Sequence, residues 1–245
     1  ISSMKARTPF VALVRRESQR FFGSSIYFLN TGFGLAMLLL GAGYLVALRE
    51  LPATFTGAAS ALGVSTAVLI ALAASGVVAT IDTTAPSISL EGRRLWILKE
   101  APLPARTLLA AKVAFNVLVT APVLLVVAVA AALVTRAGPA DAALLFVLPF
   151  VFVVVVAQLG LLTNLAWPNL NAPNDTIAVK QGASVLAAIF GGFALVALAA
   201  AAGFALTPTL GGTGAFWVIA VGLAVLAVGE QALIRTWGVR TFAAL

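Results

Sequence analysis

The sequence contains no cysteine and no histidine, and only 9% of its 245 residues are charged. Without cysteine there is no disulfide framework and no thiol chemistry, so the redox compartment cannot be inferred. Without histidine, neither a Ser-His-Asp nor a Cys-His arrangement can be built, and zinc sites of the usual nitrogen and sulfur type are excluded. We therefore predict no catalytic residues and no metal site.

A nucleotide-binding P-loop is also missing. That motif needs Gly-Lys followed by Ser or Thr, whereas the four lysines of this sequence are followed by Ala6, Glu100, Val113 and Gln181. The chain is therefore not expected to be an enzyme by itself, and any ATP hydrolysis that it uses would take place on another chain.

Apolar residues make up 62% of the sequence. A soluble domain averages about 45–50% apolar and about 25% charged residues, so this chain cannot hide its apolar surface in one core. Uninterrupted runs of Ala, Leu, Val and Phe favour spanning helices over the alternating strands of a barrel. The sequence predicts an all-α polytopic membrane protein with six spans, at roughly 25–47, 57–80, 108–135, 142–163, 183–206 and 214–234.

The net charge of +7 follows the predicted topology. If the N-terminus is cytoplasmic, every Lys and Arg except Arg49 and Arg136 falls on the cytoplasmic side. This bias is the positive-inside rule, and it predicts that both termini are cytoplasmic. The basic charge is thus explained by the bilayer, and no nucleic-acid partner is expected.

Residues 4–23 resemble a basic amphipathic helix that lies in the membrane interface. Its apolar side chains are expected to face lipid: Phe10, Val11, Val14, Phe21 and Phe22. Its charged side chains are expected to face water and headgroups: Arg15, Arg16, Glu17 and Arg20. The alternative is an ordinary basic flank of the first span. We predict an interfacial elbow helix over 1–24 and a six-span domain over 25–245.

A polar segment, Ser87–Lys112, interrupts the apolar runs and carries seven charged residues. Three of its apolar residues share one face at helical spacing: Ile88, Leu95 and Leu98. The pattern predicts a short amphipathic cytoplasmic helix over 88–100. Trp96 is suited either to anchor a protein interface or to lie at the headgroup level, and both readings stay open.

Three neutral polar residues fall within predicted spans: Asn30, Asn116 and Gln158. They are candidates for the substrate path, while the structural alternative is interhelical hydrogen bonding at about 0.6 kcal/mol each. Asp82 and Glu230 lie near the ends of their spans, so the pattern indicates no proton or sodium relay.

Three stretches resemble the membrane subunits of six-span ABC-2-type ABC exporters. The loop between spans 2 and 3 carries Ser89, Glu91, Gly92, Trp96, Lys99, Pro102 and Lys112. The entry to span 1 carries Glu17, Arg20, Tyr27, Asn30 and Gly34. The loop after span 4 is similar to bacterial exporters of this group and carries Gly160, Asn164, Pro168, Asn174, Lys180 and Gln181.

The resemblance implies a permease in the plasma (inner) membrane of a bacterium. A separate ABC ATPase, which binds ATP and Mg, would dock on a coupling loop at 82–107, and a second copy or a second permease half would complete the pore. The start at Ile1 is also consistent with the C-terminal half of a longer exporter permease. The ATPase-coupling residues would be Ser89, Glu91, Gly92, Arg93, Arg94, Trp96, Lys99 and Pro102.

Within that loop, the resemblance makes Trp96 a buried anchor in the ATPase, surrounded by charged rim contacts. The expected rim residues are Glu91, Arg93, Arg94 and Lys99. A membrane scaffold without transport activity and a passive facilitator are the alternative functions.

Overall fold

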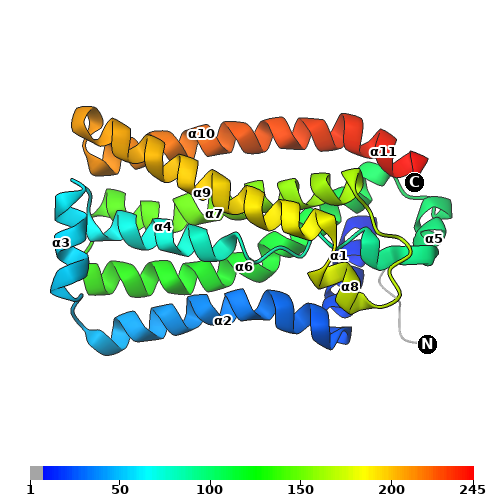
Figure 1. The fold of residues 1–245 in the computed structure, drawn as a ribbon, viewed down its shortest axis with the longest axis horizontal. Coiled ribbons are helices and arrows are strands. Elements are labelled where there is room, and N and C mark those ends of the chain that lie inside the picture. Colours follow the sequence, from blue (N-terminus) through cyan, green and yellow to red (C-terminus); the bar gives the residue numbers. More distant parts are fainter. Residues whose placement is uncertain (1–7) are drawn as a thin grey trace.

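The computed structural model describes residues 8–245, so the first part of the predicted elbow helix, with Lys5 and Arg7, lies outside the described residues. Within residues 8–245 the chain forms helices joined by turns and short irregular segments, with no strand (Figure 1). The elements are α1 (Pro9–Gly23), α2 (Ser25–Leu48), α3 (Ala53–Ala61), α4 (Thr66–Val78), the 3₁₀ helix η1 (Ser89–Arg94), α5 (Leu95–Glu100), α6 (Ala105–Thr135), α7 (Pro139–Ala166), α8 (Asp175–Lys180), α9 (Ala183–Leu210), α10 (Gly212–Leu233), the π-helical turn η2 (Ile234–Gly238) and α11 (Val239–Ala244).

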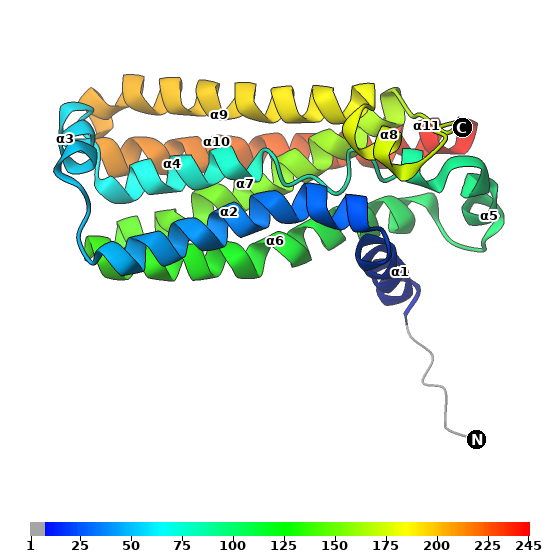
Figure 2. The same ribbon diagram turned by 60° about the horizontal axis from the view of Figure 1, so that its bottom comes forward.

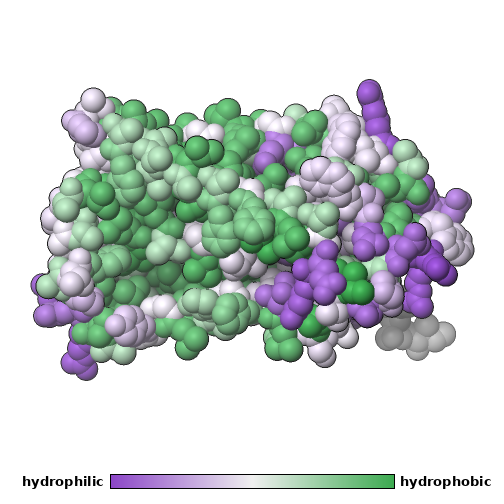
Figure 3. Space-filling model, in the orientation of Figure 1, coloured by the Kyte–Doolittle hydropathy of each residue, from purple (hydrophilic) through white to green (hydrophobic). Residues whose placement is uncertain are grey.

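The long helices form an elongated bundle around α7, which packs against α4, α6, α9 and α10. Helix α2 covers α6 on the outer side (Figures 1 and 2). Five helices, α2, α6, α7, α9 and α10, are long and apolar enough to cross a membrane, and the bent pair α3–α4 makes a sixth candidate. On the face that Figure 3 shows, apolar side chains cover most of the bundle, and polar ones gather mainly towards its ends. The predicted all-helical, polytopic membrane fold is confirmed.

The second span is not the continuous helix expected over 57–80. Helices α3 and α4 meet at 98°, so α3 lies across one end of the bundle (Figure 1). Gly63 has a φ of 69°, in the left-handed region that favours glycine. Ser65 then caps α4, because its hydroxyl accepts a hydrogen bond from the Val68 N–H at 3.3 Å. This turn chemistry outweighs the apolar character of the run.

After α4, residues 79–88 continue inside the bundle without helical structure, towards the end that holds α5 (Figures 1 and 2). All of them except Thr80 are buried. The Asp82 carboxylate accepts from the Thr84 N–H at 2.7 Å and the Ala85 N–H at 3.0 Å, an Asx-type turn that replaces helical hydrogen bonds. Pro86 supplies no N–H and disfavours the helical conformation of the residue before it. We call residues 79–88 the buried connector; the first part of the predicted coupling loop, 82–88, therefore lies inside the bundle.

The basic residues divide between the two ends of the bundle. Within 8–245, Arg49 and Arg136 follow the last residues of α2 and α6 near α3, and the others lie in elements at the α5 end (Figure 1). The predicted segregation along the bundle is therefore confirmed. That the α5 end is the cytoplasmic one stays a prediction.

Helix α1 runs across the bundle axis beside α6 (Figure 2). Two of its side chains face the protein and not the surroundings that the sequence suggested. Phe21 is 1% exposed and packs edge-on against Tyr27 and Phe115. Glu17 is 4% exposed, so it does not face water. The reversal occurs because α6 offers these residues an aromatic partner and a buried cation.

Candidate functional site

Five charged side chains from three elements meet at the α5 end of the bundle. Arg16, Glu17 and Arg20 come from α1, Glu91 comes from η1 and Lys112 comes from α6. Lys112 Nζ lies 2.9 Å from Glu17 Oε1 and 3.0 Å from Glu91 Oε1. The Arg16 guanidinium binds both carboxylate oxygens of Glu91, at 2.9 and 2.7 Å, and Arg20 Nη1 lies 2.8 Å from Glu91 Oε1. We call these five residues the charge cluster.

The centre of the charge cluster is shielded from solvent. Lys112 is 1% exposed and Glu91 is 3% exposed. Burial by itself would raise the pKa of Glu91, but the hydrogen bonds from Arg16 and the charges of Lys112 and Arg20 outweigh it and hold that pKa far below its ordinary value. Glu91 is therefore an ionised hub that joins α1, η1 and α6.

Two further contacts extend this junction along the backbone. Lys112 Nζ donates to the Ser87 carbonyl at 3.1 Å, and the Arg20 guanidinium donates to the Leu90 carbonyl. Both carbonyls flank the point where the buried connector enters η1. Charged hydrogen bonds, which are stronger than neutral ones, thus connect this part of the chain to α1 and α6.

Side chains from α2 and α6 hold the middle of the buried connector. The side-chain oxygen of Asn116, Oδ1, accepts hydrogen bonds from the Thr83 N–H at 2.8 Å and from the Thr83 hydroxyl at 2.9 Å. The Tyr27 hydroxyl donates to the Thr83 carbonyl. Backbone without helical hydrogen bonds is tolerated in a membrane bundle only when protein groups satisfy it, and these side chains do so.

Asn164 of α7 holds the end of the buried connector. Its side-chain oxygen accepts from the Ile88 N–H at 2.6 Å and the Ser89 N–H at 3.1 Å. Its amide nitrogen donates to the Ser89 hydroxyl at 2.8 Å and to the Ser184 hydroxyl, at the start of α9, at 2.9 Å. Ser184 in turn donates to the Ala85 carbonyl at 3.0 Å. One asparagine thereby links the connector to α7 and α9.

Two glycines let the bundle close around the connector. A Cβ at Gly160 would lie 1.9 Å from Oδ2 of Asp82, and a Cβ at Gly34 would lie 2.5 Å from Cγ1 of Ile81. Larger residues at these positions would collide with the connector. The close approach requires glycine at both places.

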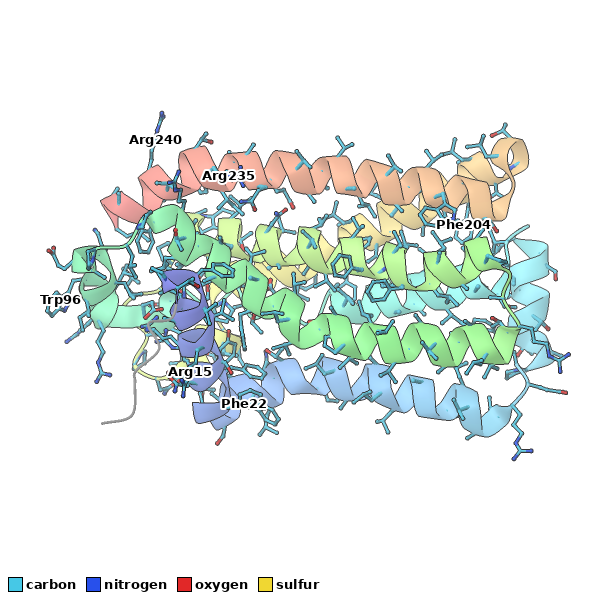
Figure 4. All side chains as sticks on the ribbon, turned by 180° about the vertical axis from the view of Figure 1, so that it is seen from behind. Arg15, Phe22, Trp96, Phe204, Arg235 and Arg240 are labelled. Atoms are coloured by element: carbon cyan, nitrogen blue, oxygen red, sulfur yellow. The ribbon has the colours of Figure 1, made fainter. Side chains whose placement is uncertain are left out.

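Beyond the charge cluster, η1 and α5 form the outermost part of this end (Figure 1). The predicted continuous helix over 88–100 is wrong, because Gly92 has a φ of 52° and breaks it. The predicted apolar face is nonetheless buried, through Ile88, Leu95 and Leu98. On the opposite side Trp96 is 63% exposed and points away from the bundle (Figure 4). Its neighbour Ile97 is 51% exposed.

Comparison with known families gives one match. Residues 31–211 match the family described as "Putative ATP-binding cassette". The chain belongs to this family. No curated protein and no solved structure matches it.

The part that matches the ATP-binding cassette family extends from α2 to the C-terminal end of α9. It includes the buried connector, α5 and Asn164, which links the connector to α7 and α9. Family membership and the spanning helices together indicate a membrane protein with a part in ABC transport. The given sequence contains no P-loop motif.

The predicted coupling residues divide into three groups by their burial. Ser89 and Glu91 are buried, so the expectation that Glu91 makes a rim contact with a partner is wrong: its carboxylate already binds Lys112 and two arginines. Gly92 is half-buried at the break before α5. The exposed members surround the outward face of α5: Arg93, Arg94, Trp96, Lys99 and Pro102.

Three of the four predicted elbow residues belong to the charge cluster and the fourth does not. Arg16, Glu17 and Arg20 belong to the charge cluster, while Arg15 is exposed on α1 (Figure 4). The sequence alone did not predict that the elbow residues and the loop residues would meet. A lysine within a predicted span was the available signal, because a buried cation requires an acidic partner.

The three candidate path residues lie in different environments. Asn116 is fully buried and holds Thr83. The side-chain amide of Gln158 meets that of Gln231 at 3.0 Å, beside a hollow against α10. Asn30 is half-buried on α2. Hydrogen bonding thus accounts for Asn116, and a role in a substrate path stays a prediction for the other two.

Proposed function

We propose that this protein is the permease component of an ATP-driven ABC transporter, an exporter of the ABC-2 type, and that a separate ATPase subunit docks on α5. Membership of the ATP-binding cassette family supports the transport assignment. The five or six helices able to span a membrane support a channel-forming role. Because the chain has no P-loop, ATP and Mg are bound and hydrolysed by the partner. A second copy or a second permease half completes the path.

The observation that carries this proposal is the construction of the α5 end. A short helix presents an exposed Trp and Ile at the extremity of the molecule. Behind it, Glu91 connects the same segment to α1 and α6 through buried ion pairs. A docking surface mounted on such a junction can pass a displacement of the partner into the membrane helices.

The exposed residues supply suitable interface chemistry. Trp and Arg contribute most to protein interfaces, and Trp96 is flanked by the exposed Arg93 and Arg94. Beside them is a hollow of about 390 Å³ lined by Trp96, Lys99 and Leu170, among others. Trp96 serves as the anchor, and the arginines and Lys99 form the charged rim.

The test is purification in mild detergent together with the coexpressed ATPase candidates of the same organism, followed by identification of bound chains. The Trp96→Ala/Ile97→Ala variant is expected to weaken binding of the ATPase by about 30-fold or more, as loss of an interface hot spot does. The matched control is Tyr44→Ala/Val46→Ala on α2, because these side chains are equally exposed, at 60% and 55%.

Recovery of a stoichiometric ATPase from the wild type and the control, with its loss from the α5 variant, supports the proposal. Equal loss from both variants would place the docking surface elsewhere. Repeated absence of any ATPase, even after crosslinking through a photoreactive residue at position 96, would favour a scaffold or a facilitator.

A further inference from the structure

Two arginines from different helices meet in a hollow on the side of the bundle, away from the charge cluster. Arg106 lies in the first turn of α6 and Arg235 lies in the π-helical turn η2. Both line one hollow of about 500 Å³, together with Phe10, Thr107 and Gln231. Within residues 8–245 neither arginine forms a salt bridge, and both are exposed. The hollow therefore offers two uncompensated cations, a hydroxyl and an amide.

A second hollow, of about 590 Å³, continues from the first along α7 and α10. Gln231 and Arg235 line both hollows. Val154, Ala227 and Val228 make the lining of this hollow mainly apolar, although Gln158 and Thr236 also contribute to it. The two hollows together form a groove with a cationic head and an apolar tail.

The position of this groove relative to the membrane decides its ligand. Arg106 begins one spanning helix and Arg235 follows the end of another, both at the α5 end, where arginines lie at the headgroup level. Phe10, on the interfacial helix α1, forms part of the wall. Basic pockets between spanning helices bind phospholipid headgroups. The apolar section extends towards the bundle centre, where acyl chains lie.

We propose that this groove is a binding site for an anionic phospholipid of the leaflet at the α5 end, with the phosphate between Arg106 and Arg235 and an acyl chain against Val154, Ala227 and Val228. The π-helical turn carries Arg235 on the same helix face as Gln231, four residues earlier. Turns of this type are frequent at functional sites. The site is independent of the docking surface on α5, so it holds whether or not an ATPase binds there.

The test is native mass spectrometry of the detergent-solubilised protein with phosphatidylglycerol and with phosphatidylcholine. The wild type is expected to retain phosphatidylglycerol preferentially. The Arg106→Gln/Arg235→Gln variant is expected to lose about 30-fold in affinity for it, about five- to sixfold for each arginine. The matched control is Arg15→Gln/Arg240→Gln, which removes the same charge from the same end. Arg15 is exposed on α1 and Arg240 points away from the bundle (Figure 4).

Equal losses in the variant and the control would show general attraction to a basic surface and would overturn the proposal. Displacement of the lipid by excess inorganic phosphate would assign the hollow to a free anion instead. Ala232→Phe fills the apolar section without changing a charge, because Ala232 lines only that hollow. It is expected to reduce lipid retention while monodispersity and helicity stay unchanged, and undiminished retention would contradict an acyl chain there.

Discussion

At the residue scale, Lys112 is the side chain on which the most separate contacts depend. Its ammonium group bonds Glu17, Glu91 and the Ser87 carbonyl within 3.1 Å, and it is almost completely buried. A buried cation is stable only when fully partnered. Its partners belong to α1 and to the chain around η1, so Lys112 fixes both segments to α6.

We expect Lys112→Met to lower the free energy of unfolding by about 3–5 kcal/mol, because it removes the buried cation 2.9 Å from the Glu17 carboxylate and leaves Glu17 only the partly exposed Arg16, at 3.5 Å. Thermal unfolding in detergent measures this change. The control is Lys99→Met, which removes an exposed lysine and should have little effect. Adding Glu17→Gln to Lys112→Met should restore part of the loss; no restoration would show that the two residues are not coupled.

The lowered pKa of Glu91 predicts that the stability of the charge cluster depends on pH. Its pKa in the folded protein lies below its ordinary value of 4.5, so ionised Glu91 contributes stability above about pH 4.5, and the contribution falls as the pH drops towards the folded pKa. Glu91→Gln should therefore cost about 3 kcal/mol at neutral pH, and the cost should shrink below about pH 4.5. Unfolding of both proteins over this range is the measurement. If the difference in unfolding free energy between the wild type and Glu91→Gln did not change with pH, it would contradict an ionised Glu91.

At the element scale, the buried connector is the unusual feature. It occupies the place of a helical half-span, and its backbone depends on side chains from α2, α6, α7 and α9 for hydrogen bonds. These contacts join the segment before η1 to most of the bundle. The segment that leads into η1 and α5 is therefore held by several helices at once.

Gly160→Ala tests how tightly the connector is held. The new Cβ would fall 1.9 Å from Oδ2 of Asp82, whose other oxygen shapes the turn of the connector. We expect a loss of about 1–3 kcal/mol in unfolding free energy. Gly222→Ala on α10 has open space around it and should be neutral or stabilising by up to about 1 kcal/mol. Equal effects of the two substitutions, measured by thermal unfolding, would show that the connector moves aside freely.

At the scale of the whole molecule, α5 and the basic residues of 8–245 other than Arg49 and Arg136 lie at one end, and α3 lies at the other (Figure 1). The positive-inside rule then predicts that the α5 end faces the cytoplasm. This orientation places α5 where a soluble ATPase can reach it.

The absence of cysteine makes the orientation directly testable. We expect Gly57→Cys on α3 to react with a membrane-impermeant maleimide in intact cells, and Trp96→Cys on α5 to react only after the membrane is opened. Both positions are exposed in the chain, so in cells that lack the ATPase candidates reactivity reports the side of the membrane. Labelling of Trp96→Cys in intact cells would reverse the topology and place α5 beyond the reach of a cytoplasmic ATPase.

The sequence alone determined the helical membrane fold, the approximate limits of most spans and the separation of basic charge along the bundle. These properties depend on the length of apolar runs and on local charge. Both can be identified in the sequence without knowing which elements pack together in space. It did not predict the 98° bend between α3 and α4, because turn chemistry at Gly63 and Ser65 competed with a strong apolar signal.

Only the tertiary structure decided how the separate motifs combine. Glu17, Glu91 and Lys112 lie far apart in the chain, yet they form one buried ion network. The resemblance implied that Glu91 lies at a partner's surface, but α1 and α6 surround it with cations. Burial and charge pairing are set by elements distant in sequence, so the outward face of α5 and the inward role of Glu91 could be told apart only after folding brought those elements together.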